Sequence, residues 1–509
     1  MAPTHEGTSS SSAHSTDEKE RIASPVALPT PGAAPVLEVT NADYALAVSE
    51  QKLDPYSWSS LRLFAILAVA FMGSMSNGFD GQVMGAVNGM QQYLDYFDIS
   101  GDDAGGGVGT VTAIIFGQIA GMAVAGPLAD RLGRRGGMFF GAIIIAIGAI
   151  VVTVAKDTDY LLGGRFVLGF GVSITTTACP AYVVEMSPPQ WRGRLTGLYN
   201  TSYYAGSILC TGIAIGTEQL QSTTSWRSPL AIQLVPAGIL IIFSLFLPES
   251  PRWLLATGKP EQARAILAKY HGAGDPHAPL VELQWREFED AIKQDASDKR
   301  WYDYSELVNT PNARYRTFMM LLMAFFGQWS GNGLGYFLTV LFKNSGVESQ
   351  RARLVLNFVN TIVSAVGALI GTSLTDKVGR RRMWFWGTLG SAAMLAIATA
   401  CTAEFGETGS SKSGSNSAIA FILEGALILH VVPVMWRLSL RQYYIVYVVW
   451  DIFECCMIWF FAVETKGRTL EELDEIFTDP HPVRASIRKR KVAVVEGNGE
   501  KQVVEVAQA

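Results

Sequence analysis

A carboxyl group lies inside the first long apolar segment of the chain, residues 62–84. This acid is Asp80, and Arg165 near the start of the fourth apolar segment has the charge to pair with it. An ionisable group inside a bilayer is costly unless it is paired or reaches water, so a functional role is the default interpretation. A carboxylate beside an arginine stays ionised, whereas one that loses this contact in a low dielectric takes up a proton more readily. The pair could therefore couple proton uptake to helix movement; the alternative is a purely structural ion pair.

A charged turn occurs twice. The segment GPLADRLGRR ends at Arg135, and GTSLTDKVGRR ends at Arg381. Asp130 and Arg134 of the first copy lie 246 positions before Asp376 and Arg380 of the second. Both copies follow a long apolar run. Two halves with one internal plan are a common build of secondary transporters. We expect the turns to clamp neighbouring helices in one state and release them in another.

Composition places the chain in a membrane. Of its 509 residues, 49% are hydrophobic and 17% charged, whereas soluble proteins have about 25% charged residues. The net charge of -5 is spread out and predicts no nucleic-acid partner. The five cysteines lie mostly inside apolar runs without metal-ligand spacing, so neither disulfides nor a metal cofactor is expected.

Apolar segments long enough to span a bilayer predict an all-α membrane protein. We count eleven, at about 62–84, 107–129, 137–155, 160–183, 194–215, 228–247, 316–342, 354–375, 383–402, 418–436 and 443–463. Basic residues follow the second, fourth and eighth segments, and the loop after the first is acidic, so the amino terminus is predicted to be cytoplasmic. The predicted organisation is a disordered cytoplasmic tail (1–57), a six-helix half (58–247), a cytoplasmic linker with short helices (248–315), a shortened second half (316–463) and a cytoplasmic tail (464–509).

Several motifs together resemble the sugar porters of the major facilitator superfamily, in particular a fungal lactose permease and hexose transporter-like branch. They are NGFDGQVMG, GPLADRLGRR, GRFVLGFG, PAYVVEMSPPQWRG, LPESPRWLL, GQWSGNG and VETKGRTLEELDEIF, and the likeness covers roughly residues 60–480. The resemblance implies two six-helix halves that rock around a sugar bound near the midplane of the plasma membrane. It further implies a monomeric, non-enzymatic protein that uses a proton gradient and no cofactor.

The resemblance assigns Asp80 and Arg165 as the proton-coupling pair. It also implies a cytoplasmic gate network, which in the first half consists of Asp130, Arg134, Arg135, Glu185, Arg192, Glu249 and Arg252, and in the second half of Asp376, Arg380, Arg381 and Glu464. Taken singly, each of these residues could be a solvated loop charge.

A sugar site needs amide and aromatic side chains, because a neutral polyol is held by amide donors and acceptors and by flat ring faces. Gln328, Trp329 and Asn332 in the seventh segment supply that chemistry. By resemblance, Asn200 takes the place of a sugar-binding glutamine and Tyr336 lies in the outer gate. The alternative for each is helix packing through polar residues. The chain is one residue shorter than the family pattern before the aromatic pair.

The second half is too short for the family plan. Glu249 follows Arg134 by 115 residues, whereas Glu464 follows Arg380 by only 84. One transmembrane helix is therefore predicted to be missing, together with counterparts of Glu185 and Arg192. Glu424 and His430 in the tenth segment match nothing in the family. We expect a proton-coupled transporter of lactose, another disaccharide or a hexose, and expect this shortened chain to be transport-deficient. A non-transporting sugar sensor is the alternative function.

Overall fold

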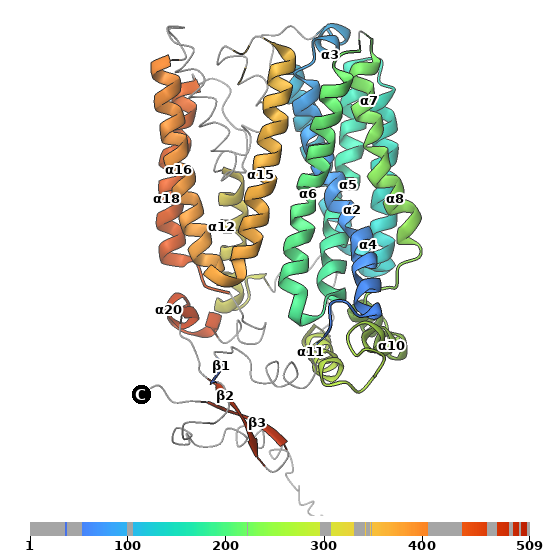
Figure 1. Cartoon of the computed structure of the whole chain (residues 1–509), viewed down its shortest axis with the longest axis vertical. Helices are drawn as coiled ribbons and strands as arrows, with labels where there is room; N and C mark the ends of the chain where they lie inside the picture. The colour runs from blue at the N-terminus through green and yellow to red at the C-terminus, as the bar shows by residue number, and fades with distance from the viewer. Residues whose placement is uncertain are drawn as a thin grey trace, which may run out of the picture.

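The computed structural model of the chain describes residues 36–37, 53–98, 105–220, 222–295, 307–329, 342, 347, 349–405, 440–465, 476–487, 492–497 and 500–505. Its long helices form two groups that stand side by side (Figure 1). The first group contains α2 (Trp58–Val87), α3 (Gln91–Tyr96), α4 (Gly105–Thr153), α5 (Thr158–Met186), α6 (Pro189–Thr217), α7 (Thr224–Ile232) and α8 (Leu234–Ser244). The second contains α12 (Pro311–Trp329), α15 (Gln350–Val378), α16 (Arg380–Phe405) and α18 (Leu440–Phe461).

Between the two groups in sequence lie the linker helices α9 (Pro251–Ala256), α10 (Pro260–Tyr270) and α11 (Pro279–Asp295). Figure 1 shows α10 and α11 at one end of the first group, and we call this end of the bundle the linker end. The short helix α20 (Pro482–Ile487) lies at the same end of the second group.

The helices coincide with ten of the eleven predicted segments. The segment 418–436 lies outside the described residues, as do most residues after 329 of the seventh segment. Within the described residues, five helical stretches are long and apolar enough to cross a membrane: Trp58–Val87, Thr112–Thr153, Thr158–Met186, Thr224–Ser244 and Gln350–Leu374. The all-α membrane bundle predicted from the sequence is therefore confirmed.

Local chemistry sets where several helices begin. The Ser57 hydroxyl accepts the backbone N–H of Ser60 at the start of α2, and the Asp157 carboxylate accepts that of Tyr160 at the start of α5. Such caps satisfy backbone donors that have no partner within the helix. Pro189 opens α6, in the first turn, where the missing N–H of proline removes no helical hydrogen bond.

Close backbone approach holds the first half together. The backbone at Gly133 divides α4 into two helical stretches, and both pack on α5: Gly117 of the first lies directly against the backbone of Phe166, and Gly148 of the second against that of Leu168. Helices in lipid gain little from apolar burial, so they associate through such close van der Waals packing at small residues.

Among the described helices, α6 of the first half and α15 of the second pack along a seam between the two halves (Figure 1). Near the linker end, Gly197 and Thr201 of α6 meet Thr372 of α15, with 3.3 Å between the two threonine hydroxyls. At the opposite end, the backbone N–H of Gln91 donates to the Gln350 side chain at 3.1 Å. Gln91 belongs to α3, and along the seam itself Gly212 of α6 lies against the Phe358 ring of α15, so the described residues of the two halves are in contact toward both ends of the bundle.

A small antiparallel sheet outside the bundle was not predicted. It joins β1 (Val36–Leu37), β2 (Val492–Gly497) and β3 (Glu500–Glu505), with Val36 opposite Ala493. The composition of residues 1–57 predicted a disordered tail, but residues 36 and 37 of that tail pair with the other end of the chain.

Candidate functional site

The Asp80 and Arg165 side chains form an ion pair in the interior of the first half. Arg165 Nη1 donates to Asp80 Oδ1 at 2.5 Å, and the two residues are only 2% and 4% exposed. Asp80 comes from α2 and Arg165 from α5, so the contact joins two separate helices. Both residues were predicted as a pair from the sequence, and the structure brings them together.

The surroundings of this ion pair are apolar and tightly packed. Phe79 and Val83 flank Asp80 in a buried cluster that also contains Tyr93 and Cys210. Water therefore screens the pair very little, and each charge depends on the other. Loss of one partner would leave an uncompensated buried charge, which is strongly destabilising. A proton on the Asp80 carboxylate would remove the Coulombic attraction between α2 and α5 at this point.

A second charged cluster lies at the linker end of the first half. The Arg134 guanidinium makes a two-pronged contact with Glu185, with Nε to Oε2 and Nη2 to Oε1 both at 3.1 Å. Arg134 also reaches Asp130 at 2.9 Å, and the Ser250 hydroxyl donates to Glu185 at 2.5 Å. These contacts tie α4, α5 and the start of α9 together, and two-pronged arginine–carboxylate pairs are among the strongest hydrogen-bonded ion pairs.

The Glu249 carboxylate is held by backbone groups. Its Oε1 atom accepts the N–H groups of Arg134 at 3.0 Å, Arg135 at 3.3 Å and Ser250 at 2.9 Å. Burial raises the pKa of Glu249, and these N–H bonds oppose that rise. Gly133 makes the approach possible, because its backbone (φ 81°, ψ 169°) lies in a region that is almost closed to other residues, and a Cβ there would strike Glu249.

The second half repeats this backbone arrangement around Glu464. The N–H groups of Arg380 and Arg381 donate to the Glu464 carboxylate at 3.0 and 3.2 Å. Gly379, like Gly133, has a positive φ of 99°, and a Cβ on it would also strike the glutamate. The Arg381 guanidinium donates to the Trp459 carbonyl at 2.6 Å, as that of Arg135 does to the Leu247 carbonyl at 3.2 Å.

The two clusters differ at one position. The Arg380 guanidinium donates to the Thr465 hydroxyl at 3.1 Å, where its counterpart Arg134 contacts Glu185. In the part of the chain that the structure describes, no carboxylate forms an ion pair with the Arg380 side chain. The Asp376 backbone lies in α15, but its side chain is outside the described residues.

The remaining predicted gate residues lie at the same end. Arg192 is in the first turn of α6 and is close enough to the buried His271 to interact with it electrostatically. Arg252 lies in α9, and its neighbour Trp253 donates its indole N–H to the Asp130 carbonyl at 2.7 Å.

The predicted sugar site is largely outside the described residues. Gln328 and Trp329 close α12, but nothing is described of their side chains, and Asn332 and Tyr336 fall in the undescribed segment that follows. Asn200 is on α6, the helix that borders the other half, and its side chain is exposed. The sugar-site assignment therefore stays a prediction.

Two buried acids in α18 were not predicted as site residues from the sequence. Asp451 and Glu454 are 0% and 1% exposed, and neither carboxylate oxygen of Asp451 has a hydrogen-bond partner among the described residues. Ser391 of α16 lies beside Asp451. Their positions in the sequence could have indicated a site, because two acids three positions apart in an apolar segment share one face of a helix. No group of three or more potential metal-ligating side chains occurs in the described residues.

Known proteins with related sequences are transporters. Residues 66–438 match the family of sugar (and other) transporters. The MFS-type transporter criB of Aspergillus cristatus is 27% identical over 439 residues, which cover 80% of this chain and 92% of the relative. A probable quinate permease of Aspergillus flavus is 30% identical over 373 residues, covering 69% and 68%. The major myo-inositol transporter IolT of Bacillus subtilis is 30% identical over 338 residues, covering 66% and 69%.

Solved structures of the proton:xylose symporter XylE have the same fold. The form bound to 6-bromo-6-deoxy-D-glucose superposes with a TM-score of 0.66 at 22% identity, covering 82% of this chain and all of that one. An inward-open form from E. coli gives a TM-score of 0.56 at 20% identity, covering 81% and 99%.

Proposed function

Because the chain belongs to the family of sugar (and other) transporters in the major facilitator superfamily, we propose that its fold serves to move a sugar or related cyclic polyol together with a proton, an activity that the short second half of this chain is expected to impair. The observation that carries this proposal is the buried ion pair between Asp80 and Arg165. An acid that is paired in one arrangement of the helices and released in another can take up a proton on one side of the membrane and lose it on the other.

The substrate class follows from chemistry and from the relatives. A quinate permease and a myo-inositol transporter are named for ring compounds with several hydroxyl groups. Amide and aromatic residues predicted at the midplane suit such compounds, with lactose, another disaccharide or a hexose as specific candidates. Gln328→Ala is expected to weaken sugar binding by about 1–3 kcal/mol, the cost of leaving buried polar groups unpaired.

In the proposed cycle the two halves move against one another along the α6–α15 seam, so that the sugar site opens to one side of the membrane at a time. The linker end is proposed to be cytoplasmic, because basic residues gather in the turns there, and the plasma membrane is the proposed location. In this scheme the clusters around Glu249 and Glu464 hold the cytoplasmic ends of neighbouring helices together while the opposite face opens. Proton uptake by Asp80 would loosen α2 from α5 and so favour the next step of the cycle.

The test uses proteoliposomes with an imposed pH gradient and radiolabelled sugar. Asp80→Asn is expected to abolish uphill accumulation but to retain sugar exchange in the absence of a gradient, because Asn cannot carry the proton. Asp159→Asn, which changes an exposed acid in the first turn of α5, is the matched control and should accumulate sugar normally. If the chain lacks activity because of its short second half, both substitutions are made in a version with a restored helix. Undiminished accumulation by Asp80→Asn would contradict proton coupling through this residue.

A non-transporting sugar sensor is the second candidate function. It is favoured by one observation, namely that Arg380 has no acidic partner among the described residues to match the contact of Arg134 with Glu185. A sensor would bind sugar on the purified chain with an affinity unaffected by Asp80→Asn, and would exchange no sugar in proteoliposomes.

A further inference from the structure

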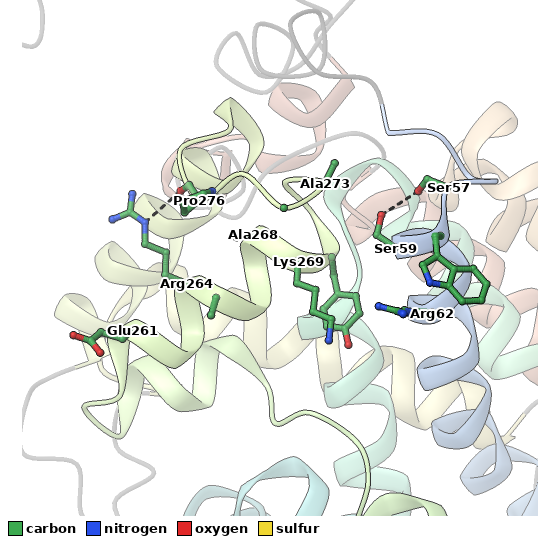
Figure 2. A pocket seen from close by; sticks show the side chains of 13 residues that line it. Ser57, Ser59, Arg62, Glu261, Arg264, Ala268, Lys269, Ala273 and Pro276 are labelled. Carbon is green, nitrogen blue, oxygen red and sulfur yellow. Dashed lines mark hydrogen bonds between the residues drawn. The ribbon is translucent and has the colours of Figure 1, made fainter.

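A cavity of about 890 Å³ lies between the start of α2 and the linker helix α10 (Figure 2). It is bordered on one side by Ser57 and the first turns of α2, and on the other by residues of α10 and of the turn that follows. Arg62 in its wall precedes Asp80 by 18 residues, which corresponds to about 27 Å along a helix. The cavity is thus separate from the ion pair proposed to couple proton movement, and its volume is in the range of ligand sites in proteins.

Two cations face this cavity from opposite walls. Arg62 comes from α2 and Lys269 from α10, and Figure 2 shows both side chains directed into the space between the helices. Both are exposed, and neither forms an ion pair with any described carboxylate. Like charges that face one another repel, so an anion placed between them would be stabilised by both.

The other charged groups in the wall leave the cavity positive. Arg264 is already engaged, because it pairs with Glu282, donates to the Pro276 carbonyl at 3.3 Å and stacks over Trp285 at 5.3 Å. Glu261 is the one acid among three basic residues that line the cavity. Arg62 and Lys269 lie over the rings of Trp58 and Tyr270, so an incoming anion would meet both cations without displacing an ion pair of the described residues.

The α2 wall adds polar hydrogen-bonding groups. The hydroxyls of Ser57 and Ser59 lie 3.1 Å apart, and Figure 2 shows their contact at the edge of the cavity. Ser57 also caps the start of α2, where the helix dipole is positive. Hydroxyl donors, a positive helix end and two cations form a set suited to the oxygens of a phosphate group.

The level of the cavity relative to the bilayer points to the source of that phosphate. Trp58 opens the apolar helix α2 and is 68% exposed, and tryptophan at such a position marks the headgroup layer. Arg62 lies one turn deeper, yet its guanidinium stacks over the Trp58 ring at 5.1 Å, which brings the charge back toward the same layer. The cavity therefore opens where lipid headgroups lie.

We propose that this cavity binds the phosphate group of an anionic membrane lipid, between Arg62 of α2 and Lys269 of α10. The bound headgroup would bridge the first transmembrane helix and the linker. Lipid composition would in this way control how firmly the linker helices are docked on the bundle. The site depends on neither the identity of the sugar nor the coupling to protons.

Lipid binding is tested on the purified full-length chain in detergent. The probes are dioctanoyl phosphatidic acid, dioctanoyl phosphatidylcholine and inorganic phosphate, and their affinities are measured from the shift in thermal unfolding during titration. The chain is expected to bind phosphatidic acid, and to bind the two other probes at least tenfold more weakly. Inorganic phosphate binding as tightly as phosphatidic acid would overturn the lipid as the source.

Substitutions then locate the site. Arg62→Gln with Lys269→Gln is expected to weaken phosphatidic acid binding about 25-fold, at about fivefold for each cation. Lys259→Gln is the matched control, because Lys259 is an exposed linker cation that does not line the cavity. Arg62→Lys with Lys269→Arg keeps both charges and should retain binding, which separates lost charge from misfolding. Unchanged affinity in the double glutamine variant, or an equal loss in Lys259→Gln, would overturn the assignment.

Discussion

The Glu464 carboxylate accepts the backbone N–H of Arg380 at 3.0 Å, although the chain between the two residues is 31 residues shorter than between their counterparts Arg134 and Glu249. Helices α16 and α18, which carry the flanking residues, pack directly on one another. The contact therefore does not depend on the length of the intervening chain. The difference in length falls between Arg380 and Glu464, and among the described residues the Arg380 guanidinium contacts a threonine hydroxyl where that of Arg134 contacts Glu185.

The backbone turn at Gly133 is expected to tolerate no side chain. Gly133→Ala should lower stability by about 1–3 kcal/mol, because its φ and ψ are strained for any other residue and the new Cβ would strike Glu249. Gly379→Ala should do the same against Glu464. The measurement is the thermal unfolding midpoint in detergent.

Gly126→Ala is the control for this prediction. Gly126 lies in the helical stretch that precedes the turn at Gly133, and nothing lies within 4 Å of the position that a Cβ would take there. Its unfolding midpoint should stay close to that of the wild type. Equal midpoints for Gly133→Ala and Gly126→Ala would show that the turn is not held as described.

The parts of the site that could be predicted are those in which a charged side chain inside an apolar segment is costly without a partner of opposite charge. Asp80 and Arg165 lie in apolar segments, and each is costly without the other, so their residue types alone indicated a contact. The repeated charged turns likewise indicated two equivalent clusters. Their geometry, with Glu249 and Glu464 bound to backbone N–H groups, could not be inferred, because it depends on the φ and ψ of one glycine in each turn.

Other features escaped because their partners are distant in sequence. Val36 pairs with Ala493, and no local pattern in a tail rich in Ser and Pro predicts such a contact. His271 contacts Met186 across 85 positions. Asp451 and Glu454 were visible as acids in an apolar segment, but their burial depends on the packing of α18 against α16. Sequence periodicity located the helices themselves well, because the requirement for about 20 apolar residues per span is strict.

The buried ion pair should be more sensitive to loss of one charge than of both. Arg165→Ala is expected to destabilise the protein by about 3–5 kcal/mol, because Asp80 is then buried without its partner. Asp80→Asn combined with Arg165→Ala should recover a substantial part of this loss, since no buried charge remains. Unfolding midpoints of the two single variants and the double variant, measured at one pH, give the interaction energy. A double variant less stable than Arg165→Ala would contradict the pairing.

The docking of the linker on the bundle is expected to weaken in acid through His271. This residue is 1% exposed, its Nδ1 contacts the Gln284 amide, and its Nε2 lies 3.0 Å from the Met186 carbonyl. Burial lowers the pKa of His271, with the hydrogen bonds opposing this and the nearby Arg192 adding to it. The Gln284 oxygen Oε1 faces Nδ1, and the amide nitrogen has no hydrogen-bond partner among the described residues. With this side-chain amide turned by 180°, its N–H donates to Nδ1 and a neutral ring with Nε2–H donating to the Met186 carbonyl satisfies both contacts.

The sign of this pH dependence follows from the lowered pKa. In the unfolded linker His271 binds a proton near pH 6.5, whereas in the folded linker it does so only at lower pH. The stabilisation that the buried neutral ring contributes is therefore complete above pH 6.5. It is lost as the pH falls below that value, by at most about 1.4 kcal/mol per pH unit. Amide hydrogen exchange of residues 260–289, corrected for intrinsic rates, should show faster opening at pH 5.5 than at pH 7.5.

Two variants check that His271 is responsible. His271→Gln cannot be protonated, and its docking should change little between the two pH values. His277→Gln alters a histidine whose side chain is 75% exposed and should leave the wild-type pH dependence intact. Identical pH dependence in the wild type and in His271→Gln would exclude this residue as the titrating group.

The chain as it stands is expected to be transport-deficient, and restoring the missing helix should repair it. The first half has both the backbone contacts at Glu249 and the side-chain contact between Arg134 and Glu185. The second half has the backbone contacts at Glu464, but Arg380 reaches only a threonine hydroxyl among the described residues. A clamp without its ion pair should hold the linker end closed less firmly. A missing helix also removes a packing partner, on which association in lipid depends.

The measurement is uptake of radiolabelled sugar in a host without its own sugar transporters. The 509-residue chain is compared, at matched surface levels, with a version that contains the missing helix and its acidic turn from a relative. We expect accumulation only by the restored version. In that version, replacing the restored acid that faces Arg380 by Gln should lower accumulation, and Glu185→Gln should do so in the first half. Robust accumulation by the 509-residue chain itself would show that the clamp at Glu464 is sufficient without an acidic partner for Arg380.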